Sequence, residues 1–105
     1  MKEAHMSLES TTERMSKKIA MAHGLNATIK FDFGDDGIIF VDATQNPATI
    51  SHEDEEADTT FSCSLSVFEK ILDGEQDPNI AFMMGKIKIR GNMGLALKLN
   101  SIMED

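Results

Sequence analysis

The chain has 105 residues, a net charge of −8 and a single cysteine. A chain of this length forms one domain around one core, and its acidity excludes general nucleic-acid binding, which requires a basic face. One cysteine allows no internal disulfide and fits a reducing compartment. No apolar run reaches the roughly eighteen residues of a membrane span, and the first residues lack the apolar segment of a signal peptide, so we expect a cytoplasmic protein. We assign residues 6–105 to the domain and residues 1–5 to an extension that is either disordered or artificial.

Methionine and phenylalanine dominate the larger apolar side chains. There are eight methionines and six phenylalanines, with no Trp or Tyr. Methionine is flexible and polarisable, which suits a surface that adapts to apolar ligands of varied shape. The same residues also serve as ordinary core, and composition alone favours that interpretation.

The first predicted element is an amphipathic helix over residues 10–23. Ser10-Thr11-Thr12-Glu13 has the pattern of a capping box at the start of a helix. Met15 and Ile19 are one turn apart and share an apolar face, and Gly24 supplies a terminator. Such a stripe is more typical of a helix packed on a sheet than of one lying on a membrane.

Four short strands follow. Residues 26–33 alternate between apolar and polar side chains, which indicates a half-buried strand. Residues 34–37 read Gly-Asp-Asp-Gly and predict a hairpin connection. We expect further strands at 38–41, 48–51 and 58–63, with an antiparallel meander up to residue 58.

The second half of the chain predicts a helix, a short helix, a strand and a final helix, over residues 66–72, 77–84, 86–90 and 93–103. Ser66 to Glu69 has the pattern of a second capping box. Asp77-Pro78 is a common helix start, Gly85 favours a helix end, and Asn92 is an N-cap candidate for the last helix.

A family resemblance is carried by residues 81–99, AFMMGKIKIRGNMGLALKL. This stretch closely resembles the C-terminal signature of the sterol carrier protein type-2 lipid-binding domain, over about twenty positions of mixed chemistry. The resemblance implies an α+β fold: a mainly antiparallel five-stranded sheet with about four helices over one face, enclosing an apolar tunnel. It also implies lipid binding without catalysis or a cofactor.

The resemblance gives candidate tunnel-lining residues. Phe82 and Met83 match the signature directly, and the others are placed by the face of the helix or strand that they occupy. Many family members carry glutamine where this chain has Met84, which leaves the preferred head group open. The full set of candidates is Phe33, Phe40, Ile50, Phe61, Phe68, Leu72, Phe82, Met83, Met84, Leu95, Leu99, Ile102 and Met103.

Other polar features have simpler explanations than catalysis or metal binding. The acidic run 53–56 matches no calcium-loop pattern and is interpreted as a solvated loop. Asp35-Asp36 is interpreted as part of a turn rather than as a pair of catalytic carboxylates. The histidines share no metal-ligand spacing, and Cys63 is in phase with Phe61, so we expect a buried thiol.

We therefore predict a non-catalytic domain that binds, and by extension transfers, fatty acids, fatty acyl-CoA, sterols or similar apolar ligands. The alternative is an accessory or dimerising module of a lipid-metabolising assembly, and a homodimer stays open; an enzyme would need an activated nucleophile. Lys86, Lys88 and Arg90 form a basic row that either protects a sheet edge or contacts an anionic membrane. We expect the final helix, residues 93–103, to open for ligand entry, or failing that the helix at 66–72.

Overall fold

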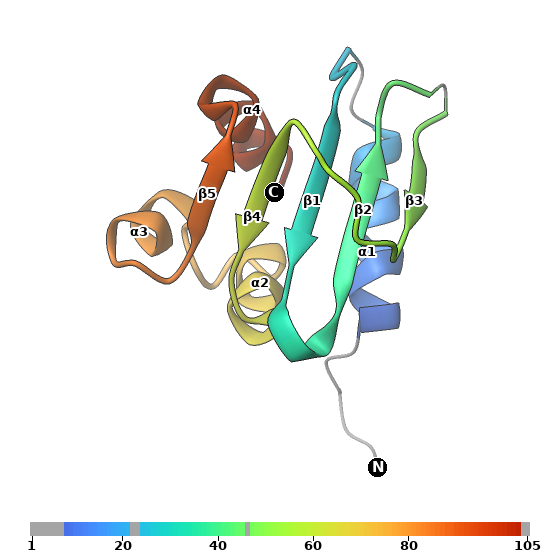
Figure 1. Cartoon of the computed structure of the whole chain (residues 1–105). Helices are drawn as coiled ribbons and strands as arrows, with labels where there is room; N and C mark the ends of the chain where they lie inside the picture. Colours follow the sequence, from blue (N-terminus) through green and yellow to red (C-terminus); the bar gives the residue numbers. More distant parts are fainter. Residues whose placement is uncertain (1–7, 22–23, 46, 104–105) are drawn as a thin grey trace.

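The computed structural model describes residues 8–21, 24–45 and 47–103. The elements are, in chain order, α1 (Leu8–Ala20), β1 (Thr28–Asp32), the 3₁₀ turn η1 (Gly34–Asp36), β2 (Ile38–Asp42), β3 (Thr49–Ser51), β4 (Thr59–Ser62), α2 (Leu65–Leu72), α3 (Pro78–Met83), β5 (Lys88–Gly91) and α4 (Met93–Met103) (Figure 1). The proposed extension, residues 1–5, lies outside the described part of the chain.

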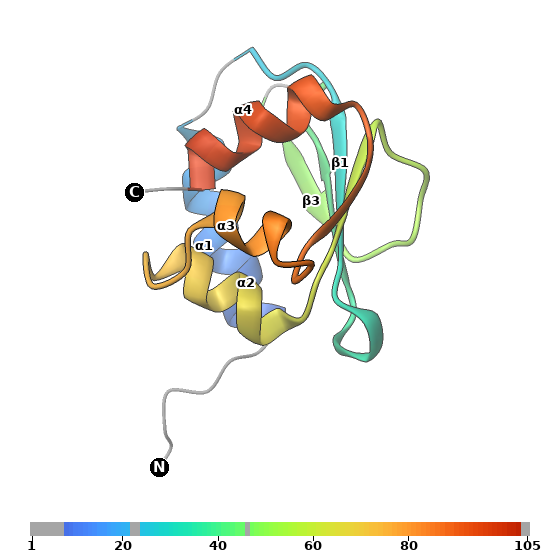
Figure 2. The ribbon, with the colours of Figure 1, turned by 90° about the vertical axis from the view of Figure 1, so that its left-hand side faces the viewer.

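The strands form one sheet in the order β3-β2-β1-β4-β5. β1 with β2, β2 with β3, and β4 with β5 pair antiparallel, whereas β1 and β4 pair parallel. The helices lie on one side of the sheet (Figure 2). The predicted α+β fold with a five-stranded, mainly antiparallel sheet is therefore confirmed, as is the meander of β1 to β3.

The parallel pair arises because the chain crosses the sheet after β3. Residues 52–58 pass over the face opposite the helices and deliver β4 to the free side of β1 (Figure 1). Lys30 of β1 forms an ion pair with Asp54 of this crossing, with the Lys30 Nζ and Asp54 Oδ1 atoms 2.7 Å apart. The acidic run is thus an exposed connection, as the sequence predicted.

Alternation along β1 sets the inner face of the sheet. Ile29, Phe31 and Phe33 are buried in the core, whereas Lys30 between them belongs to the outer face. In an extended strand successive side chains point to opposite faces. α1 covers this inner face with Met15, which is fully buried, and with Ile19.

Two predicted helix starts were wrong. Ser10 lies inside α1, which contains Leu8 as its first described residue, so Ser10 to Glu13 is no capping box. α2 begins at Leu65, and its N-cap is Ser64, whose hydroxyl accepts from the Val67 amide at 3.1 Å. Each pattern placed the serine one or two residues inside the real helix. α1 also ends at Ala20 rather than at residue 23, which lies outside the described residues.

The turns around the last three elements match the prediction. The Asp77 side chain accepts from the Asn79 and Ile80 amides at the start of α3. The Asn92 side chain accepts from the Leu95 amide at 3.0 Å, which caps α4. Gly85 follows α3 with a φ of +80°, a conformation that glycine adopts without a steric penalty.

Candidate functional site

An aromatic cluster joins the inner face of the sheet to α2. The Phe31 and Phe61 rings stack with their centroids 5.2 Å apart, and Phe68 of α2 lies 5.3 Å from both Phe31 and Phe33. Because aromatic side chains bury a large apolar area, this cluster makes a large contribution to the apolar core between sheet and helices.

The structure brings six of the sequence-predicted lining residues into one buried cluster. They come from β4, from the residue directly after β1, and from α2 and α4, and are Phe33, Phe61, Phe68, Leu72, Leu95 and Leu99. Their side chains are in contact, as the Phe33 and Phe68 rings show. A guest molecule would therefore enter this space only if part of the helix layer moved away from the sheet.

Three other predicted residues point away from that cluster. Phe82, Met83 and Met84 are 41%, 81% and 63% exposed, respectively. α3 itself buries only Pro78 and Ala81. The apolar side chains around this short helix thus form an outer surface.

The remaining predicted residues are scattered. Phe40 is buried but stands between Ile39 and Val41, which belong to the inner cluster, so Phe40 lies on the outer face of the sheet. Ile50 and Ile102 are half-buried and pack against the inner cluster. Met103 is the last residue of α4, and its side chain lies outside the described part of the structure.

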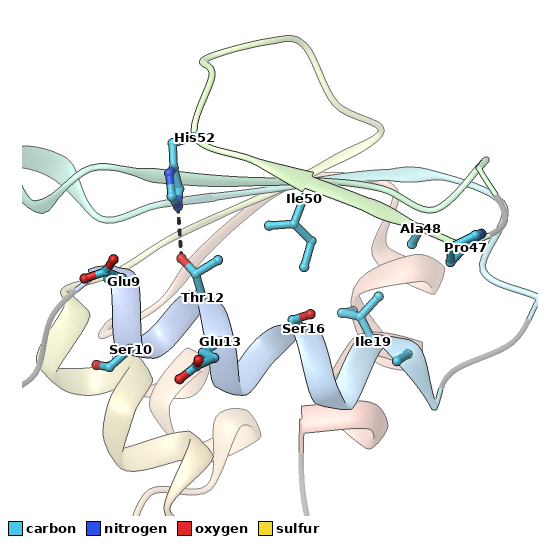
Figure 3. Close-up of a pocket in the computed structure, with 11 residues that line it drawn as sticks. Glu9, Ser10, Thr12, Glu13, Ser16, Ile19, Pro47, Ala48, Ile50 and His52 are labelled. Atoms are coloured by element: carbon cyan, nitrogen blue, oxygen red, sulfur yellow. Dashed lines mark hydrogen bonds between the residues drawn. The ribbon is translucent and has the colours of Figure 1, made fainter.

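An open groove of about 760 Å³ separates α1 from the edge strand β3 (Figure 3). Ile50 points into it from the strand, and Glu9 and Glu13 of α1 lie along its rim. At one end the Thr12 hydroxyl and His52 Nε2 form a hydrogen bond of 3.0 Å. The groove mixes polar and apolar side chains, and no local pattern in the sequence indicates it, because Thr12 and His52 on its two walls are 40 residues apart.

A second hollow, of about 380 Å³, opens beside Phe33 at the ends of β1 and β4. Lys86 and Lys88 contribute to its lining together with Asp32 and Cys63. Lys86 and Lys88 of the basic row and Phe33 of the aromatic cluster thus line the same hollow.

A polar clamp fastens α1 to α2 next to the aromatic cluster. The buried Thr11 hydroxyl donates to Glu69 Oε2 at 2.6 Å, and Arg14 donates to Glu69 Oε1 at 3.1 Å. The same Arg14 reaches Asp73 Oδ1 at 2.7 Å. The sequence suggested only a helix cap at Glu69, so this contact between helices was missed.

Cys63 and the His, Asp and Glu side chains are the groups that could serve as a nucleophile or as metal ligands. Burial raises the pKa of the Cys63 thiol to about 12, which leaves it protonated at neutral pH. Among residues 8–21, 24–45 and 47–103 no group of three His, Cys, Asp or Glu side chains is placed to hold a metal ion. No helix in that part of the chain is long and apolar enough to cross a membrane.

A family model described as "SCP-2 sterol transfer family" matches residues 8–104. The chain belongs to this family. Human sterol carrier protein 2 is 35% identical over 104 residues, which is 96% of this chain and 18% of the human protein. Bovine hydroxysteroid dehydrogenase-like protein 2 is 39% identical over 71 residues, or 66% of this chain and 17% of that protein. The chain thus spans under a fifth of the length of these relatives.

Solved structures of the SCP-2 family share the fold. Sterol carrier protein 2-like 2 from Aedes aegypti superimposes with a TM-score of 0.76 at 21% identity, covering 91% of this chain and 95% of that one. A solution structure of the same Aedes aegypti protein in palmitated form has a TM-score of 0.72 at 22% identity, covering 95% and 96%. At such identities the likeness establishes the α+β architecture of this SCP-2 domain.

Proposed function

We propose that this SCP-2 domain binds one lipid at a time, with the apolar part of the lipid between the inner face of the sheet and the helices. The observation that carries the proposal is the continuous apolar cluster that Phe33, Phe61 and Phe68 share with α4. Membership of a sterol transfer family supports it, as does the palmitated form of a related structure. The ligand class is fatty acids, acyl-CoA, sterols or similar molecules, and no bond is made or broken.

The binding force is the hydrophobic effect. Each methylene moved out of water contributes about 0.8 kcal/mol, so about ten buried methylenes contribute roughly 8 kcal/mol before the entropy of association, on the order of 4 kcal/mol or more, is subtracted. For ten methylenes the remainder, about 4 kcal/mol, corresponds to a Kd of about 1 mM, and about fifteen buried methylenes are needed to reach a Kd of about 1 μM. Because the force is non-directional, we expect broad specificity.

Ligand entry requires an element that can move, and we propose α3. It buries only Pro78 and Ala81, whereas α4 buries Leu95, Ala96 and Leu99. Segments with few buried contacts open at low free-energy cost. The sequence pointed to the final helix because it is near the chain end, but burial favours the helix before it.

The test begins with the delipidated protein and a fluorescent fatty acid. We expect saturable 1:1 binding that unlabelled palmitate displaces. Native mass spectrometry of the protein before delipidation should show a co-purifying lipid. In hydrogen exchange, amides of residues 80–84 should exchange faster than those of residues 97–102, and lipid should slow them. Absence of saturable binding with every acyl chain tried would reject the carrier function.

The second candidate function is that of an accessory or dimerising module in a lipid-metabolising protein. It is favoured by the observation that the chain matches under a fifth of each longer relative, one of which is named for dehydrogenases. Native mass spectrometry separates the two, because an empty dimer supports the module and a lipid-loaded monomer supports the carrier. For either function we place the protein in the cytoplasm, whose reducing conditions suit the free Cys63.

A further inference from the structure

Charge is strongly segregated along this chain. Residues 78–103 contain four cations and no carboxylate. The rest of the chain holds six cations and eighteen carboxylates, a net charge of −12. The last part of the fold therefore has a charge of +4 within an otherwise acidic molecule, with Asp32 of β1 lining the same hollow as Lys86 and Lys88.

The same region exposes most of the large apolar side chains that lie in water. Six of the seven exposed large hydrophobic residues of the described chain belong to it, namely Ile80, Phe82, Met83, Met84, Met93 and Leu97. Large apolar side chains that gather in one exposed region are typical of interaction sites. Together with the exposed Lys86, Lys88 and Arg90 these residues are called the docking face below.

The fold brings the two helical parts of the docking face together. α3, β5 and α4 lie side by side at one edge of the sheet (Figures 1 and 2). A hydrogen bond of 3.2 Å from the Asn100 side-chain amide to Asn79 Oδ1 ties α4 to α3. Met93, Leu97 and Asn100 follow one another at helical spacing, so their stripe runs towards α3. Ile80 follows Asn79 in α3 and is the first of the exposed apolar residues of that helix.

The cations border this apolar surface. β5 is the edge strand of the sheet next to α3 and α4. Lys88 and Arg90 therefore lie at the edge of the sheet, on the strand face opposite Ile89. Long Lys and Arg side chains can lay their stems along apolar surface and place the charge at the level of lipid head groups. An apolar surface bordered by cations matches a membrane interface with anionic lipids.

We propose that the docking face binds the surface of membranes that contain anionic lipids. The other amphipathic helix is not available for this role, because the apolar stripe of α1, Met15 and Ile19, is buried against the sheet. The role of this docking rests on the proposed carrier function. Docking would place α3, the helix expected to open, against the bilayer from which a lipid enters.

The experiment measures co-sedimentation with phosphatidylcholine vesicles, with and without phosphatidylserine. We expect binding to the phosphatidylserine vesicles that weakens as salt is raised, since screening shortens the reach of surface charge from about 10 Å at 0.1 M to about 3 Å at 1 M. Lys88→Gln with Arg90→Gln should weaken it by roughly 30-fold, at about fivefold per cation. Ile80→Gln with Leu97→Gln should weaken it on the order of tenfold.

The matched control is Met21→Gln with Lys17→Gln, a pair in α1 and directly after it that does not belong to the docking face. Met21 is 81% exposed, as much as Met83, and Lys17 is also exposed. This control should bind vesicles like the unchanged protein. Thermal unfolding of every variant checks that it is folded. Lys88 and Arg90 are exposed, so their double variant should fold and still tests the proposal if the Ile80 and Leu97 double variant unfolds.

Three results would overturn the proposal. The first is the absence of binding to phosphatidylserine vesicles at low salt. The second is an equal loss of binding in the control. The third is a homodimer or a complex with an acidic protein that the Ile80 and Leu97 substitutions dissociate, in the absence of vesicle binding. Fatty-acid binding without vesicles is measured in parallel, and Lys88→Gln with Arg90→Gln should leave it unchanged. If that binding fails while vesicle binding holds, the carrier function falls and the docking face stands.

Discussion

Gly91 is the last residue of β5, where the strand pairs with Thr59 of β4 just before α4 begins. Its φ is +101°, and a Cβ added there would lie 2.2 Å from the Asp58 carbonyl oxygen and 3.1 Å from Thr59 Cα. That oxygen already accepts from the Asn92 amide at 3.0 Å. The Gly91→Ala variant therefore has to move the junction of β5 and α4 away from β4.

The size of the effect follows from what the shift breaks. A non-glycine residue at positive φ costs about 1–2 kcal/mol. Loss of the Asn92 to Asp58 hydrogen bond costs about 1 kcal/mol. The buried Thr59 hydroxyl, which donates to the Asn92 carbonyl at 2.8 Å, costs a further 1–3 kcal/mol if it is left unpaired. We expect Gly91→Ala to lower the free energy of unfolding by about 3–6 kcal/mol, a large share of the stability of a small domain.

Gly85→Ala is the matched control. Gly85 also has a positive φ, of +80°, but no atom lies within 4 Å of an added Cβ. It should lose only the conformational term, about 1–2 kcal/mol. Urea unfolding of both variants, followed by circular dichroism, gives the two values. If Gly91→Ala lies within about 1 kcal/mol of Gly85→Ala, the close approach to Asp58 does not determine how β5 and α4 are held.

Three further predictions concern the clamp, the thiol and α3. Glu69→Ala should lower the free energy of unfolding by about 2–4 kcal/mol, because the buried Thr11 hydroxyl loses its acceptor, whereas Asp73→Ala should cost under about 1 kcal/mol; equal losses in urea titrations would refute the clamp. Stability should fall as the pH rises from 9 towards 12, because the unfolded Cys63 thiol ionises before the folded one, whose pKa is about 12. Cys63→Ala should remove that part of the decline, and an unchanged pH profile would contradict it. Met83→Trp should stay folded, because Met83 is 81% exposed. If α3 covers the ligand, this variant should bind a fluorescent fatty acid with a changed affinity. An unaltered affinity would remove Met83 from the residues that line the ligand site.

Local patterns in the sequence predicted the elements well where each signal is self-contained. The alternation of Ile29, Phe31 and Phe33 defined the inner face of β1, and the Asp77 and Asn92 caps placed the starts of α3 and α4. These signals depend on neighbours within a few residues. The serine caps failed because Ser, unlike Pro, is also tolerated inside a helix, so a capping pattern can occur one or two residues after the helix has begun.

Contacts between distant parts of the chain could not be predicted in this way. Nothing near β4 in sequence indicates that it pairs parallel with β1, because that pairing follows from the path of residues 52–58. Residues 38–41 are continuously apolar, so their pattern does not tell which side chains face the helices. Phe40 was therefore assigned to a lining that lies on the other face of the sheet. Likewise, Phe82 and Met83 matched a family signature, but only the structure reveals that their side chains face outward.

The placement of apolar side chains explains why binding and docking can share one region. α1 and α2 are fastened to each other by Glu69, and the aromatic cluster fastens α2 to the sheet, so this half of the helix layer resists opening. α3 buries only Pro78 and Ala81, is tied to α4 by the exposed hydrogen bond from Asn100 to Asn79, and keeps its large apolar side chains in water. Transfer of those side chains into a bilayer would stabilise an outward position of α3 without any change in the rest of the fold, because a surface that binds one conformation better shifts the population towards it. A membrane would then promote opening where lipid is available, and the acidic remainder of the chain would orient the molecule with α3 towards the anionic surface.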